Sequence, residues 1–319
     1  MPTVLTDSFA TTAIEAAIRA PSMHNSQPWR FRLRDGAIEV LADRSRQLPI
    51  ADPTGWAVHI ACGAAVYNLR LAFAVHGTPA VVQLRPDPTQ PDLMARVVPG
   101  KPRPATPTER SLYAAIPRRR SNRAPFWPEP TLAEDRTRLI EAARAEGGWL
   151  EMVIGPLAVA AVAEIARAAN RMLERNPEYL AELRSWVRGG GHVGNGIPTE
   201  AAGPRGEPHD LLPQRPFGDS PRAPGRDFEP EPLVAVLGTH ADTPTDQLVA
   251  GEALQAVLLT ATDAGLAVSM LSQPIEVPSA REQLRRGLGR FGVPQMVMRI
   301  GYGQPQPGTP RRPVAEVLA

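Results

Sequence analysis

Arginine and serine gather in one short stretch of the sequence, IPRRRSNRAPFW at residues 116–127. Its arginines stand at positions 118, 119, 120 and 123, with Ser121 between them. Guanidinium groups bind phosphate oxygens through paired hydrogen bonds, and a serine hydroxyl adds a short one. The stretch therefore predicts a site for a phosphorylated ligand. The alternative is a solvated arginine run at a helix end, where cations also interact favourably with the helix dipole.

A second stretch, APSMHNSQPW at residues 20–29, follows a helix-like run and collects small polar groups beside a tryptophan. Pro21 is expected to stop the helix, while Ser22, Asn25 and Gln27 present donors and acceptors and Trp29 is buried beside them. Such a loop can hold a polar heterocycle. Its alternative reading is a helix end with local side-chain turn bonds and a core tryptophan.

An internal repeat indicates which elements position these stretches. GAAVYNLRLAFAVHG (63–77) and GEALQAVLLTATDAG (251–265) have glycines at the same spacing, and each is followed by a β-like run, TPAVVQL and LAVSML. Both segments are apolar on nearly all faces, as buried helices are, and each ends in a glycine suited to a left-handed helix end. The repeat predicts two related halves.

The remaining elements alternate loosely and predict an α+β architecture. No GxGxxG follows a strand and no GxxxxGK[ST] is present, so neither a Rossmann dinucleotide site nor a P-loop is supported. Strands are expected near 29–33, 37–42, 149–154, 233–238 and 294–301, and helices at 9–19, 109–117, 131–146, 156–188 and 278–289.

The 36 prolines are concentrated in two stretches, 86–107 and 198–232. The first is interpreted as a linker, which gives halves of 1–104 and 105–319. The second is longer than a compact domain leaves without structure, and such loops are often lids. We therefore predict a proline-rich lid inserted at about 171–232, in which LRSWVR (183–188) offers an aromatic residue, Trp186, and arginines as a cover for a ligand.

Bulk composition limits the classes of function. With 35 Lys and Arg against 33 Asp and Glu in 319 residues, the charge is only +2, so no general field for nucleic acid is expected. A lone Cys62 forms no internal disulfide, the N-terminus lacks a secretory pattern, and no apolar run is expected to span a bilayer. A cytoplasmic protein is expected, without a metal and without a membrane partner.

Taken together, the motifs resemble the FMN-dependent nitroreductase superfamily. APSMHNSQPWRF is similar to the family's flavin-contacting segment, and RRSNR (119–123) to its phosphate-binding signature. PQMVMRIGYGQPQPGTPRRPVAEVL (294–318) is similar to its closing strand, glycine turn and arginine-bearing end. The motif order resembles the actinobacterial Acg-like branch, in which two halves are fused. The resemblance covers most of 9–319 except the lid, and it implies a nitroreductase-like fold arranged as an intramolecular pseudo-dimer.

The resemblance also implies one composite flavin site per chain, hence one FMN. The first half has the NxQPW loop without an upstream RRSxR, whereas the second half has RRSNR without a second NxQPW. From the second half, the phosphate and ribityl chain would be met by Arg119, Ser121 and Arg123. The tail adds Arg311 or Arg312, since Pro310-Arg311-Arg312 departs from the family's K-x-R pattern.

Other site residues are implied on the ring side of the flavin. From the first half, Pro21, Ser22, Asn25 and Gln27 would reach the isoalloxazine and ribityl groups. Ser272 and Gln273 in SMLSQP (269–274) match the family by position only. His24 is a candidate donor beside the flavin, or else a histidine at the surface or behind the site.

The implied activity is that of an oxidoreductase whose FMN is reduced by NADPH or NADH and reoxidised by a nitroaromatic or quinone. The protein itself needs no catalytic acid, base or nucleophile, because the flavin carries that chemistry. The alternative is an FMN storage or sequestration protein, because a flavin covered by the lid cannot meet NADPH. A hydrolase built on Ser22 and His24 lacks a GxSxG elbow and an orienting acid. A small-molecule electron acceptor is the expected partner, and the fused halves favour a monomer.

Overall fold

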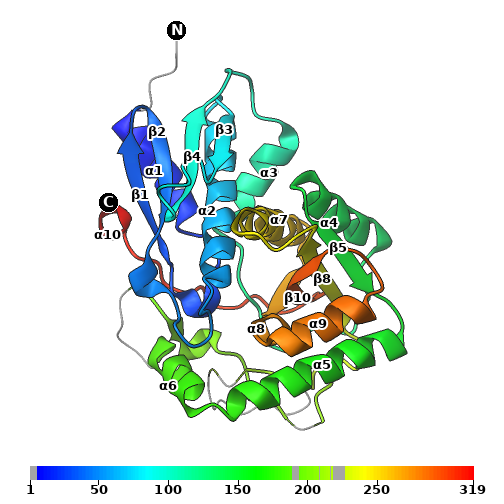
Figure 1. Cartoon of the computed structure of the whole chain (residues 1–319). Helices are drawn as coiled ribbons and strands as arrows, with labels where there is room; N and C mark the ends of the chain where they lie inside the picture. The colour runs from blue at the N-terminus through cyan, green and yellow to red at the C-terminus, as the bar shows by residue number, and fades with distance from the viewer. Residues whose placement is uncertain (1–5, 189–193, 208, 216, 218–226) are drawn as a thin grey trace.

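The computed structural model of the chain describes residues 6–188, 194–207, 209–215, 217 and 227–319. Two four-stranded antiparallel sheets lie on either side of a central helix pair, α2 (Trp56–Val75) and α7 (Pro244–Asp263) (Figure 1). The predicted α+β architecture is confirmed. Each sheet packs its own apolar core against the helix pair, so the centre of the molecule is also the seam between its two parts.

The two sheets have the same strand order and the same antiparallel pairing. The first runs β1-β2-β4-β3 and the second β5-β8-β10-β9, so the repeat extends beyond α2 and α7 to strands on both sides of each helix. We call these units the first half and the second half. Their strands are β1 (Trp29–Arg34), β2 (Ala37–Ala42), β3 (Ala80–Leu84) and β4 (Leu93–Pro99), then β5 (Trp149–Val153), β8 (Leu233–Thr239), β9 (Ala267–Leu271) and β10 (Val293–Gly301).

The helices around this frame also correspond. α1 (Asp7–Ala17) leads into β1 as α4 (Ala133–Ala145) leads into β5, and each packs on the central helix of its own half. The other helices are α3 (Pro107–Ala115), α8 (Gln273–Glu276), α9 (Pro278–Gly287) and α10 (Val314–Val317). The tail ends against the first half, because Leu318 bridges to Phe31 of β1 (Figure 1).

The central helices approach each other closely at the first glycine of each repeat. A Cβ added to Gly63 would overlap the carbonyl oxygen of Leu248, and one added to Gly251 would overlap that of Ile60. A buried hydrogen bond of 2.8 Å from Gln255 Nε2 to Asn68 Oδ1 crosses the same contact. Because Gly63 and Gly251 have no side chains, α2 and α7 can pack this closely, and their contact sets the distance between the halves.

Among the described residues, helix α2 is the one helix long and apolar enough to cross a membrane, although no apolar run of that length was expected from the sequence. However, 89% of its most apolar window is buried inside the protein. Its apolar surface contacts α1, α7 and the first sheet. These contacts account for its hydropathy as that of a core helix.

The connection between the first two strands is where the halves differ most. In the first half, β1 and β2 are joined by a tight turn at Asp35 and Gly36, whereas β5 and β8 are joined by residues 154–232. We call 154–232 the insertion, which begins before the predicted lid at 171. It runs along one end of the molecule past both halves (Figure 1). Parts of the predicted lid, including 189–193 and 218–226, lie outside the described residues.

Two predictions within these segments were wrong. The expected helix 156–188 is two helices, α5 (Pro156–Glu174) and α6 (Pro177–Trp186), because Asn176 caps the second one through bonds to its first amides. The expected linker 86–107 contains β4, which lies between β2 and β3 in the sheet. A strand can form here because the prolines only flank its apolar residues. A boundary near residue 104, between β4 and α3, remains our proposal.

We expect Gly251→Ala to destabilise the protein by about 2 kcal/mol, because the new methyl group must push α2 away from α7. Gly287→Ala in α9 is the matched control, since nothing lies within 4 Å of its added Cβ. The control should stay within about 1 kcal/mol of the wild type or gain stability. Urea unfolding measures both, and equal behaviour of the two variants would contradict the close helix contact.

Candidate functional site

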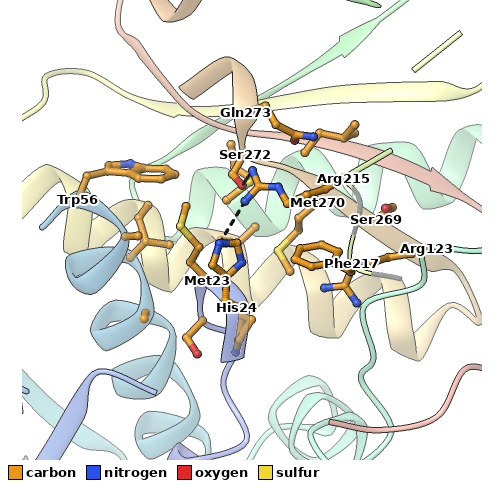
Figure 2. Close-up of a pocket in the computed structure, with 18 of the residues that line it drawn as sticks. Met23, His24, Trp56, Arg123, Arg215, Phe217, Ser269, Met270, Ser272 and Gln273 are labelled. Atoms are coloured by element: carbon orange, nitrogen blue, oxygen red, sulfur yellow. Dashed lines mark hydrogen bonds between the residues drawn. The ribbon is translucent and has the colours of Figure 1, made fainter. Parts of the chain in front are cut away.

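Two neighbouring cavities lie at the seam between the halves and share Pro21, Ser22 and Arg123. One is lined largely by arginines, and we call it the basic cavity. The other is lined by methionines, aromatic rings and aliphatic side chains, and we call it the apolar cavity (Figure 2). The loop 20–28 of the first half and the segment 119–123 thus meet here, although about 100 residues separate them in the chain.

The basic cavity carries guanidinium groups and no carboxylate among the described residues that line it. Arg119 is buried, and its Nε and Nη1 atoms have no hydrogen-bond partner among the residues that the structure describes. The Nε atom of Arg311 is also buried without a partner. Polar groups that could join these donors come from Ser22, Asn25, Ser121 and Thr309, and the arginines are Arg19, Arg119, Arg120, Arg123 and Arg311.

Burial and mutual repulsion shift the charge equilibria of these arginines. Burial first, and then neighbouring guanidinium groups, lower the pKa of Arg119 and of Arg123 to about 10. The same causes lower the pKa of Arg311 to about 9. A buried cation is costly unless an opposite charge pairs with it. The cavity is therefore arranged for an anion.

The arginine segment is held by the second half. Ser121 bridges to Val268 of β9, and the amide of Asn122 donates to the Val268 carbonyl at 2.9 Å. Further along, the carboxylate of Glu229 accepts from the Phe126 amide at 3.0 Å and forms a buried ion pair with Arg299 at 2.7 Å. These bonds fix the backbone that presents Arg119, Ser121 and Arg123.

The loop from the first half is strained. His24, Asn25 and Gln27 all have left-handed backbone angles, with φ of 52°, 56° and 53°. Non-glycine residues seldom adopt this conformation, and it is most often found where function requires it. The hydroxyl of Ser22 accepts from the Gln27 amide at 2.9 Å and closes the turn. Pro21 lies beyond the end of α1 and lines both cavities, as Ser22 does.

The tail completes the basic cavity through Arg311. Its Nη1 atom donates to Asn25 Oδ1 at 2.9 Å, while the Asn25 amide donates to the carbonyls of Pro310 and Gly196. Asn25 and Arg311 both line the basic cavity. Loop, tail and insertion are thus joined at one asparagine.

Gln27 and Arg312 are not brought to either cavity. The Gln27 side chain accepts from the Arg312 amide at 2.9 Å and donates to the Gly194 carbonyl at 2.6 Å. The guanidinium of Arg312 points to Asp43, 3.8 Å away. Both side chains are therefore occupied in bracing the tail. Of the two tail arginines, only Arg311 lines the basic cavity.

The apolar cavity receives the other predicted residues, His24, Ser272 and Gln273. Trp56, at the start of α2, forms one wall and donates through Nε1 to Gln295 at 2.8 Å. Ile60 of α2 and Leu254 of α7 line the same space, so both central helices contribute to it. The remaining walls include Met23, Met270 and Met296.

The insertion adds Arg215 and Phe217, which sequence reasoning missed. They lie in a proline-rich stretch without periodicity, so no signal in the sequence pointed to them. Trp186, the aromatic residue expected to help cover the ligand, lines neither cavity. Its ring lies 5.7 Å from the guanidinium of Arg46 and packs against a hydrophobic cluster that includes Leu48 and Phe217.

The second half has no counterpart of the loop 20–28. α4 and β5 are separated only by Glu146, Gly147 and Gly148, whereas residues 18–28 separate α1 from β1. Both connections lead into a tryptophan, Trp29 or Trp149. The shortened connection supports the prediction of a single composite site. Among the described residues, no group of His, Cys, Asp and Glu could hold a metal ion.

Two proteins of Mycobacterium tuberculosis are similar to this chain over nearly its whole length. "Putative NAD(P)H nitroreductase Rv3131" is 33% identical over 323 residues, which cover 96% of this chain and 90% of that protein. "Putative NAD(P)H nitroreductase acg" is 32% identical over 330 residues, which cover 99% and 97%. A nitroreductase structure with bound FMN from Desulfitobacterium hafniense aligns with a TM-score of 0.39 at 16% identity, covering 63% of this chain and 93% of that one. No family model matches the sequence.

The chain therefore belongs to the family of these mycobacterial acg-like nitroreductases. The resemblance stated from the motifs is confirmed.

Replacing Arg119 by methionine tests whether the basic cavity is built for a ligand and not for stability. We expect Arg119→Met to raise the free energy of unfolding of the ligand-free protein by about 1 kcal/mol, because a buried unpaired charge is removed. Arg118→Met, one residue away and exposed, should change it by less than about 0.5 kcal/mol. Urea unfolding after extensive dialysis measures both. A clear loss of stability in Arg119→Met would mean that the guanidinium serves the fold.

Proposed function

We propose that the protein is an FMN-binding, nitroreductase-type oxidoreductase whose flavin is reduced by NADPH or NADH and reoxidised by a nitroaromatic or quinone. The names of its two mycobacterial relatives support this class of reaction. The observation that carries the proposal is the pairing of the two cavities. Guanidinium groups that have no acidic partner in the described part of the chain lie next to an apolar space, which matches the charged and the planar ends of FMN.

Each part of the site has a role in holding the cofactor. Arg119 and Arg311 would bind the phosphate, because their buried donors lack partners. The walls formed by Trp56 and Met270 would exclude water from the ring. Arg123, which lines both cavities, would place positive charge near the ring and so favour an anionic reduced state. FMN itself supplies the hydride and electron transfer when bound.

Titration with FMN and with riboflavin separates the phosphate contacts from the ring contacts. We expect one FMN per chain, and we expect Arg311→Met to weaken FMN binding by roughly tenfold or more, because it removes charge-assisted hydrogen bonds. Riboflavin lacks the phosphate, so its affinity should hardly change. Arg312→Met should have a smaller effect on FMN than Arg311→Met. Flavin fluorescence quenching measures all of these.

Three outcomes would count against the proposed site. They are a failure of the wild-type protein to bind FMN, binding of two flavins, and an equal loss of FMN and riboflavin affinity in Arg311→Met. The last would show that the variant disturbs the whole site and not the phosphate contact.

A second function, FMN storage with little turnover, is favoured by the position of the insertion. Its residues line both cavities, Phe217 in the apolar one and Ala201 in the basic one. Arg215 also forms an ion pair with Glu276 in which the side chains are only 6% and 0% exposed. An insertion held in place in this way would keep the nicotinamide of NADPH away from the flavin ring unless the insertion moved aside.

Anaerobic mixing of the FMN complex with NADPH separates the two functions. For the oxidoreductase we expect the flavin absorbance to bleach within seconds, and to return when a quinone is added. Persistence of the flavin band with NADPH and with NADH, despite ready reduction by dithionite, would support storage and overturn the enzyme.

The cytoplasmic location and the monomeric state also remain proposals. The contact between α2 and α7 lies within one chain, which supports a monomer because each central helix already has its partner. Light scattering of the purified FMN complex determines the mass directly.

A further inference from the structure

Arg215 belongs to the insertion, yet its guanidinium contacts residues from both halves. Nη2 donates to Ser272 Oγ at 3.1 Å and to the carboxylate of Glu276, both in the second half. Nη1 lies 3.4 Å from Nε2 of His24 in the first half. Figure 2 shows the guanidinium between His24 and Ser272 at the edge of the apolar cavity.

The surroundings of Arg215 leave it little freedom. Glu276 also accepts from the hydroxyl of Tyr179 at 3.2 Å, and the Tyr179 ring lies 5.9 Å from the guanidinium. Phe217 lies 5.7 Å from Arg215 and 4.7 Å from Arg123, so its ring is placed between two cations. The same ring stands nearly perpendicular to the His24 ring, with 5.6 Å between the ring centres. The side chain is therefore fixed by packing as well as by charge.

This arrangement determines the state of His24. A guanidinium only donates hydrogen bonds, so Nε2 of His24 must accept and the proton of a neutral ring must be on Nδ1. Burial, then the charges of Arg215 and Arg123, lower the pKa of His24 well below 6.5. The carboxylate of Glu276 is paired with Arg215. In the described part of the chain, Nδ1 makes no hydrogen bond to another residue, and His24 lines the cavity.

We propose that Arg215 is a positioning residue of the site, which holds His24 as a neutral donor whose Nδ1–H serves a hydrogen-bond acceptor on the ligand in the apolar cavity. The proposal deepens the proposed function, on which it rests for the identity of that ligand as the flavin. It follows that the insertion is part of the site and does more than cover it. Where the insertion is displaced, His24 loses both its tautomer and its orientation.

Nitrogen-15 NMR of the histidine rings in the full chain tests the first part without any flavin. The His24 signals are assigned by their loss in His24→Asn, a residue type that tolerates the left-handed backbone. We expect a neutral Nδ1–H tautomer that stays unprotonated well below pH 6.5, because the folded pKa lies below the ordinary value. An Nε2–H tautomer, or a ring protonated at pH 7, would overturn the proposal.

Arg215→Met with Glu276→Leu then removes the guanidinium without leaving a buried carboxylate unpaired. The His24 pKa should rise and the two tautomers should mix, so the ring becomes protonated at a higher pH than in the wild type. Arg184→Met, exposed on α6 of the same insertion, is the control and should leave the His24 spectrum unchanged. A His24 spectrum that is the same in the double variant as in the wild type would contradict a positioning role.

FMN affinity tests whether His24 and Arg215 act on the ligand through the same contact. We expect His24→Asn, and separately the double variant, each to weaken FMN binding by about three- to tenfold, the worth of one hydrogen bond. The triple variant should be no weaker than either, because both changes remove the same contact. Losses that multiply in the triple variant would overturn the proposal. If the wild type binds no FMN, the proposed function fails while the NMR result still decides the role of Arg215.

Discussion

The close contact of α2 with α7 is the constraint on which the rest of the structure depends. Gly63 and Gly251 let each helix approach the backbone of the other, and a single methyl group at either position has no room. Each helix carries its own sheet, so this contact fixes how the halves face each other. The apolar cavity is lined by Ile60 and Leu254 from the two helices, so its width is set by the same contact.

The seam also gathers features that cost stability. Arg119 is buried and Arg311 is half-buried, and neither has an acidic partner among the described residues, while the loop that faces them holds His24 and Asn25 in left-handed conformations. In a structural element such costs would be difficult to explain, because surface arginines and glycines would serve better. They are understandable where an anionic ligand supplies the missing charge and the loop must present several polar groups at once.

The sequence predicted the features that leave a local or periodic signal. The repeated glycine-bounded helices, the strands after them and the motifs at 20–29 and 119–123 were all readable, and the structure brings these motifs together. The strand β4 was missed because its prolines suggested a linker, although they only flank an apolar run. Arg215 and Phe217 could not be predicted, because their position depends on where a long insertion folds back. The sequence could not distinguish Arg311 from Arg312. The structure distinguishes them, because the tail passes Asn25 with Arg311 bonded to that residue and Arg312 directed to Asp43.

A crystal structure of the chain grown with FMN would test the central claim most directly, namely that the two halves share one flavin at their seam. The account predicts one FMN per chain, with its phosphate against Arg119 and Arg311 and its ring in the cavity bounded by Trp56 and Met270. Flavin density within a single half, at a second position, or nowhere in a crystal grown with saturating FMN would contradict it.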